Sequence, residues 1–87
     1  MNLKTLLGKN VKYYRFRKKL TQEQLAETLD ASSNYIGRLE RGQHSPSLEK
    51  IEIIANALDI EPYELFIRRN DTDKLPNRVN LIDKNKK

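Results

Sequence analysis

The segment from residue 20 to residue 42 constrains the fold most, because it predicts two short helices joined by a very tight turn. Thr21 can cap the first helix while the Gln24 side chain reaches back to it, which forms a capping box. Ser32 can cap the second helix, and Gly42 is a residue typical of a helix end. Only an aspartate and an alanine remain for the turn, and aspartate tolerates a left-handed backbone. We therefore expect the two helices to meet at a sharp angle.

Apolar spacing predicts which side of each of these helices is buried. Leu25, Ala26 and Leu29 fall on one side of the first helix, and Ile36 and Leu39 fall on one side of the second. If these sides face a core, the opposite side of the second helix points into solvent. The residues on this outward side are Ser33, Asn34, Gly37 and Arg38.

The same spacing predicts three further helices. The first covers residues 3–18, the second follows a cap at Ser47, and a short last helix starts at Glu61 with Pro62 in its first turn. Five helices leave no room for a sheet, so we expect an all-α, compact five-helix domain over residues 1–67. Residues 68–87 form a polar, basic C-terminal tail, expected to be either a dimer clasp or disordered. The apolar stripes are Leu3, Leu7, Val11 and Tyr14 in the first helix, and Leu48, Ile51, Ile54, Ala55 and Leu58 in the one after Ser47.

Composition excludes several classes of protein. The 87 residues are enough for one domain, and they include no cysteine for a disulfide or a cysteine-based metal site. No apolar run approaches the roughly 20 residues that span a bilayer, and no signal peptide is evident, so we expect a cytoplasmic protein. Neither a nucleophile–base pair nor a phosphate-binding glycine loop nor a metal cluster can be assembled. We therefore expect no enzyme, no metal, no cofactor and no small-molecule ligand.

Charge is distributed in blocks along the chain. Residues 1–22 carry seven basic side chains and no acid, residues 23–67 carry three against nine, and residues 68–87 carry seven against three. A basic first helix and a basic tail around an acidic centre suit a polyanionic partner. Charged blocks of this kind also keep a small protein soluble, so charge alone does not decide between the two interpretations.

Residues 3–66 resemble the XRE-type, lambda-repressor-like helix-turn-helix domain. The resemblance implies a transcriptional regulator that binds double-stranded DNA, usually as a homodimer on a palindromic operator. Lys19 and Asp30 depart from the family, which often has glycine at both positions. The matching motifs are Arg15, Leu20–Ala26, Ile36–Gly42, Pro46–Leu48, Ala55, Ala57, Leu58, Ile60 and Glu64–Phe66.

The outward side of the second helix of the motif has the chemistry for reading bases. Arg38 can donate two hydrogen bonds to guanine, and Asn34 can pair with the edge of adenine. Ser33 is an adaptable donor or acceptor, and Gly37 would let the helix backbone approach the bases closely. The competing interpretation is a small, solvated surface with no ligand.

Phosphate contacts are expected from four residues around the motif. Gln22 lies at the first turn of its helix, where free amides attract an anion, and the resemblance implies the same role. Tyr35 either stacks on the sugar-phosphate backbone or packs across the corner, and His44 is expected to be an exposed loop residue. The resemblance further implies a structural ion pair between Arg15 and Glu40. The four phosphate candidates are Gln22, Tyr35, Arg41 and Gln43.

A dimer interface is expected at the end of the domain, where apolar residues lie off the helix stripes. The competing interpretation is that the chain's own tail covers Ile53 and Ile67. A different class of function is also open: an antitoxin-like or adaptor protein whose main role is to bind a protein partner, through the apolar residues of its tail. The interface candidates are Ile53, Pro62, Tyr63 and Ile67, and the apolar tail residues are Leu75, Val79, Leu81 and Ile82.

Overall fold

The computed structural model describes residues 2–69, which form four α-helices and one 3-10 helix and contain no strand. The predicted all-α class is therefore confirmed, and the fifth predicted helix is a 3-10 helix. Most of the predicted tail, residues 70–87, lies outside the described residues. The elements are α1 (Leu3–Arg17), α2 (Gln22–Thr28), α3 (Ser33–Glu40), α4 (Leu48–Leu58) and η1 (Pro62–Phe66).

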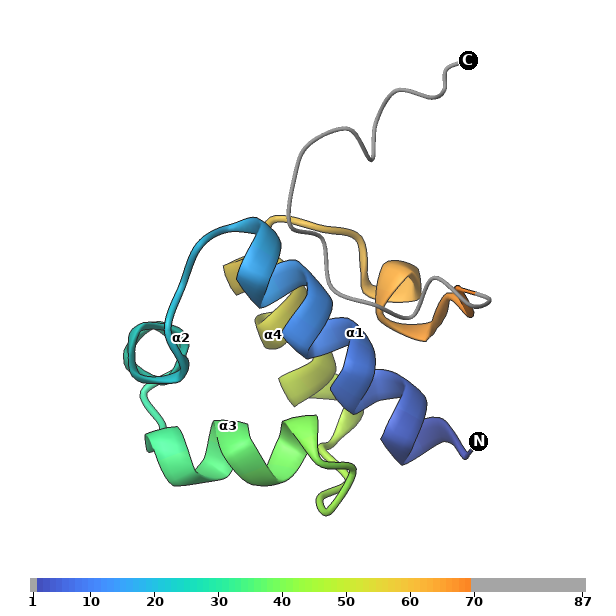
Figure 1. Cartoon of the computed structure of the whole chain (residues 1–87), viewed down its shortest axis with the longest axis horizontal. Coiled ribbons are helices and arrows are strands. Elements are labelled where there is room, and N and C mark those ends of the chain that lie inside the picture. Colours follow the sequence, from blue (N-terminus) through green and yellow to red (C-terminus); the bar gives the residue numbers. More distant parts are fainter. Residues whose placement is uncertain (1, 70–87) are drawn as a thin grey trace.

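The helices are arranged around α1, which runs across the middle of the molecule with α4 behind it (Figure 1). Helix α2 lies on one side of this pair and η1 on the other. Helix α3 forms one edge of the molecule and lies across the view in Figure 1, whereas α2 is seen end-on. No helix in residues 2–69 has the length and apolarity that crossing a membrane requires.

Side-chain caps define the helix starts as the sequence predicts. The Thr21 hydroxyl accepts from the Gln24 amide at 3.0 Å, and the Gln24 side chain accepts from the Thr21 amide at 2.8 Å. Ser32 and Ser47 cap α3 and α4 in the same way, each accepting from an amide three residues later. These caps satisfy amides that have no partner inside a helix, so each helix starts at a defined residue.

The core lies between α1, α2, α3, α4 and η1 and confirms most of the predicted stripes. Two predicted core residues are exceptions: Leu3 is 63% exposed and Leu48 is 81% exposed. Both stand at the first position of their helix. The core residues are Leu7, Val11, Tyr14, Leu25, Ala26, Leu29, Ile36, Leu39, Ile54, Ala55, Leu58 and Leu65.

Helices α1 and α3 approach each other closely at Gly8. A Cβ atom built on Gly8 would lie 2.4 Å from the carbonyl oxygen of Leu39 and 2.6 Å from that of Glu40. No side chain fits at such distances, and the obstacle is backbone, which cannot move aside cheaply. The absence of a side chain at Gly8 thus sets the spacing of the two helices.

A buried asparagine that the sequence analysis did not identify joins α1 to the end of the described chain. The Asn10 side-chain amide donates to the carbonyls of Leu65 at 2.7 Å and Ile67 at 3.0 Å. Its oxygen accepts from Arg69, whose guanidinium stacks on the Tyr13 ring at 3.7 Å. Asn10 therefore satisfies one carbonyl within η1 and one just after it. These hydrogen bonds fix the path of the chain beyond η1.

Candidate nucleic-acid interface

Helix α3 presents opposite sides to the core and to solvent. Ile36 and Leu39 are 0% exposed and pack in the core. Asn34 and Arg38 are exposed, and Ser33 is partly exposed. The packing of two apolar side chains thus holds a polar helix surface toward water, with Asn34 in its first turn and Arg38 in its second turn both accessible.

Gly37 differs from its expected placement, because it is buried. A Cβ atom built on it would lie 3.1 Å from Nη1 of Arg41 and 3.8 Å from the side-chain oxygen and nitrogen of Gln22. In this structure the Gly37 backbone is therefore covered, although the sequence predicted it on the outward side of the helix. Two long polar side chains lie over the glycine, one from α2 and one from the end of α3.

Three polar side chains form a buried network where α1, α2 and α3 meet. The Arg15 Nε donates to Glu40 Oε2 at 2.6 Å, and its Nη2 donates to Glu40 Oε1 at 3.1 Å. Gln22 Nε2 donates to the same Oε1 at 3.0 Å, and Arg15 also donates to the carbonyl of Leu20 at 2.7 Å. The structure thus contains the Arg15–Glu40 pair that the resemblance implies, with both side chains almost completely buried. It also places the Gln22 amide inside the network, a partner that the sequence did not indicate.

Arg41 and Gln43 lie together at the C-terminal end of α3. Arg41 is the C-cap residue of the helix, and its Nε donates to Gln43 Oε1 at 3.2 Å. Both residues are exposed. Among the residues that the structure describes, no carboxylate is paired with Arg41, so this positive charge is available to an anion.

Tyr35 packs across the corner that follows α3. Its ring lies edge-on to His44 with 4.9 Å between centroids, and Lys50 Nζ lies 5.9 Å from the Tyr35 ring. His44 is consequently half-buried, not fully exposed as expected. Burial raises the pKa of the Tyr35 phenol above its ordinary value.

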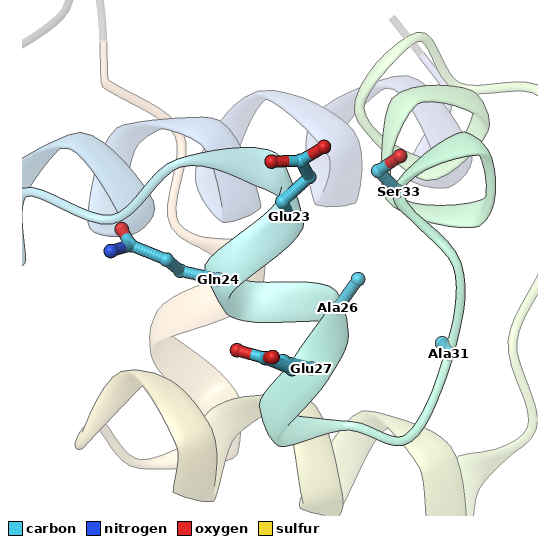
Figure 2. Close-up of a pocket in the computed structure, with 6 residues that line it drawn as sticks. All are labelled: Glu23, Gln24, Ala26, Glu27, Ala31 and Ser33. Carbon is cyan, nitrogen blue, oxygen red and sulfur yellow. The ribbon is translucent and has the colours of Figure 1, made fainter.

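An acidic depression of about 360 Å³ marks one border of this surface, between α2 and the segment leading into α3. Figure 2 shows Glu23, Ala26 and Glu27 on α2, with Ala31 and Ser33 across from them. Two carboxylates repel phosphate, so a polyanion on α3 is disfavoured on this side. Residues 2–69 contain no group of histidines and carboxylates suited to hold a metal ion.

Apolar side chains are exposed at the end of the domain that carries α4 and η1. Ile53 is 47% exposed and Tyr63 is 68% exposed, whereas Pro62 is partly covered. Ile67, at 36%, is also exposed. A largely apolar groove of about 340 Å³ lies between the two helices and is lined by Leu48, Ile51, Glu52, Pro62, Tyr63 and Phe66.

Comparison with known proteins identifies relatives of this chain. A family model described as helix-turn-helix matches residues 11–65. The control protein C.SmaI of Serratia marcescens is 38% identical over 69 residues, which cover 79% of this chain and 82% of that protein. The immunity repressor of Bacillus phage phi105 is 42% identical over 55 residues, and the chain spans only 38% of its length.

A solved structure shows the same fold. The restriction-modification controller protein C.AhdI from Aeromonas hydrophila superposes with a TM-score of 0.68 at 44% identity, over 71% of this chain and 90% of that one. The matched range of the family model includes the caps at Thr21, Ser32 and Ser47, the buried side of α3 and the polar network described above. This chain belongs to the XRE-type helix-turn-helix family of DNA-binding transcriptional regulators.

Proposed function

We propose that the protein binds a palindromic operator as a homodimer, with α3 of each subunit in the major groove. One observation carries the proposal: Ile36 and Leu39 are completely buried, and this fixes Asn34 and Arg38 on the outward side of the same helix. A helix held in this way can enter the major groove, whose base pairs each present a distinct pattern of donors and acceptors.

The proposed base contacts are made by Ser33, Asn34 and Arg38. Arg38 grips a guanine with two hydrogen bonds and Asn34 pairs with an adenine, each contributing roughly 1–3 kcal/mol of discrimination. Phosphate contacts are assigned to Gln22, Arg41, Gln43 and Tyr35 around the helix. For Gln22 the backbone amide is the better donor, because its side-chain amide already donates to Glu40.

The proposed two-fold interface lies at the end of the domain that carries α4 and η1. The exposed side chains of Ile53, Tyr63 and Ile67 support it, together with the apolar groove beside Pro62. The role of a small controller of transcription is supported by C.SmaI and C.AhdI, because the chain covers 82% and 90% of their lengths. The alternative role, binding of a protein partner through the tail, depends on residues outside the described part of the chain.

Selection of bound sequences from a pool of random DNA duplexes tests the proposal. We expect enrichment of a palindrome whose half-sites lie about one helical turn apart. Arg38→Ala and Asn34→Ala should each weaken binding to that sequence roughly 5- to 150-fold while thermal unfolding is unchanged. Asn56→Ala is a matched control for Asn34→Ala, because Asn56 is an exposed asparagine on α4. No enrichment would exclude this function, whereas full affinity in folded Arg38→Ala protein would show that the base contacts are assigned wrongly.

A further inference from the structure

The burial of Gly37 is unusual for its position on α3. Its neighbours Asn34 and Arg38 are exposed, yet Gly37 itself is covered by the side chains of Gln22 and Arg41. A glycine inside a helix is less favourable than alanine by roughly 1 kcal/mol. Helix stability therefore does not explain the glycine, and we look for its reason in the side chains that cover it.

Arg41 supplies that reason, because its guanidinium folds back along α3. The residue stands just after the last residue of the helix, but its Nη1 lies 3.1 Å from where a Gly37 Cβ would be. Arg41 Nε donates a hydrogen bond to Gln43 Oε1 at 3.2 Å, and this bond holds the Arg41 side chain in its conformation. The guanidinium therefore lies about one helical turn before the Arg41 backbone, at the level of Gly37 and close to Gln22.

The charge of Arg41 stays available in this position. Glu40, the nearest carboxylate in sequence, accepts from Arg15 and Gln22. Since no other carboxylate in residues 2–69 is paired with Arg41, the guanidinium combines a fixed position with an uncompensated charge. An arginine held in advance loses little side-chain freedom when it binds a planar or tetrahedral oxyanion.

We propose that Gly37 is a positioning residue: the space left by its missing side chain seats the Arg41 guanidinium beside Gln22, where it binds a phosphate flanking the groove. This inference rests on the proposed DNA binding and deepens it. It replaces the expected role of Gly37, direct approach of its backbone to a base, with an indirect role through Arg41. A Cβ atom at residue 37 shifts the guanidinium by a few tenths of an ångström, and a longer side chain displaces it from its seat.

Double-mutant measurements of DNA affinity test this coupling. Gly37→Ala should bind the selected duplex about two- to fivefold more weakly, and Gly37→Leu about tenfold more weakly, because a phosphate contact is misplaced or lost. In an Arg41→Ala background neither substitution should weaken binding further. The slope of log affinity against log salt should fall by about one in both Gly37→Leu and Arg41→Ala, with unchanged base preference.

Thermal unfolding separates this effect from damage to the fold. Gly37→Ala should unfold at a higher temperature than the natural chain, because alanine favours the helix, while its affinity for DNA falls. Asn56→Ala serves as the control for a substitution on an exposed helix surface. Affinity losses of equal size with and without Arg41, at an unchanged salt slope, would show that Gly37 acts directly on bases and would overturn the proposal.

Failure of the proposed function gives a different result. If the natural chain neither enriches a sequence nor binds duplexes in a salt-dependent way, both proposals fall together. If the natural chain binds and Gly37→Leu binds equally well, only the positioning role of Gly37 is wrong.

Discussion

Arg15, Glu40 and Gln22 show how single residues combine stability with the presentation of a surface. Their network connects α1 and α2 to the last residue of α3. A buried ion pair adds little net stability, but a buried charge without its partner is strongly unfavourable. The network therefore makes the orientation of α3 depend on all three residues together.

At this residue scale we expect Arg15→Ala to lower the free energy of unfolding by about 3–5 kcal/mol, because Glu40 is left buried and unpaired. The double variant Arg15→Met with Glu40→Leu should recover most of the loss, since both charges are removed. Urea unfolding followed by circular dichroism measures both changes, with Lys4→Ala on the exposed side of α1 as the control. A double variant as unstable as Arg15→Ala would contradict this account.

Lys19 carries local strain that its side chain does not relieve. Its φ of 60° lies in the left-handed region, as do those of Asp30 at 56° and Asp59 at 65°. Lysine has no short polar side chain to offset the cost of this conformation, whereas aspartate does. Both departures from the family's glycines therefore occur at residues that adopt a left-handed conformation.

Lys19→Gly should raise the free energy of unfolding by about 0.5–1 kcal/mol, because the strain of the left-handed residue exceeds the extra chain entropy of glycine. Asp30→Gly should raise the free energy of unfolding by a smaller amount, because aspartate tolerates the left-handed conformation better than lysine. Lys19→Ala keeps the Cβ atom and the strain, so it separates this cause from loss of the lysine charge. Equal stability of Lys19→Gly and Lys19→Ala in urea unfolding would refute the explanation.

At the scale of elements, the contact between α1 and α3 positions the DNA-binding surface. Gly8 lets α1 approach the backbone carbonyls at the end of α3, and Arg15 pairs with Glu40 two turns further along α1. On the opposite side of α1, Asn10 and Tyr14 contact the end of the domain: Tyr14 donates to Glu64 at 3.3 Å. Burial raises the pKa of the Tyr14 phenol, and the nearby Arg69 partly opposes the increase.

Gly8→Ala should lower the free energy of unfolding by about 1–3 kcal/mol, even though alanine is the better helix former, because the new methyl group overlaps two carbonyl oxygens. Gly37→Ala is the matched control within the same protein and should be stabilising by up to about 1 kcal/mol. Thermal unfolding of the two variants side by side measures the difference. Two stabilised variants would mean that α1 and α3 can move apart without cost.

At the scale of the whole molecule, the proposed DNA-binding surface and the exposed apolar surface are carried by different helices. The first belongs to α2 and α3, and the second to α4 and η1, which Figure 1 shows away from the outer side of α3. A two-fold axis through the second surface would leave both copies of α3 free, as a palindromic site requires.

Tyr63→Ser combined with Ile53→Ser should weaken self-association about tenfold or more, because both side chains are exposed in the single chain and would be buried only in a dimer. Sedimentation equilibrium measures the dissociation constant. Binding to a full palindrome should weaken in parallel, while binding to a single half-site should not change. Leu3→Ser is the control, since Leu3 is an apolar residue at the start of α1 that is 63% exposed. Unaltered association would place the interface elsewhere.

Local sequence patterns predict the helices because the interactions that define them span only a few residues. The helix caps bind amides only three residues away, and they are Thr21 with Gln24, Ser32 and Ser47. The apolar spacing of Ile36 and Leu39 follows from the helical repeat. The outward side of α3 is a direct consequence of that spacing. These features could be read without knowing how the helices pack.

Contacts between distant residues could not be predicted in this way. Gly8, Asn10 and Gly37 have the roles described here only because particular atoms from other helices, or from the far end of the same helix, lie against them. No periodicity marks a glycine as a contact point or an asparagine as the partner of two carbonyls 55 and 57 residues away. Helix positions and the polarity of each helix side are local properties of the chain. The burial of Gly37, the seat of Arg41 and the anchoring of η1 arise only when the helices pack, because packing alone brings those atoms together.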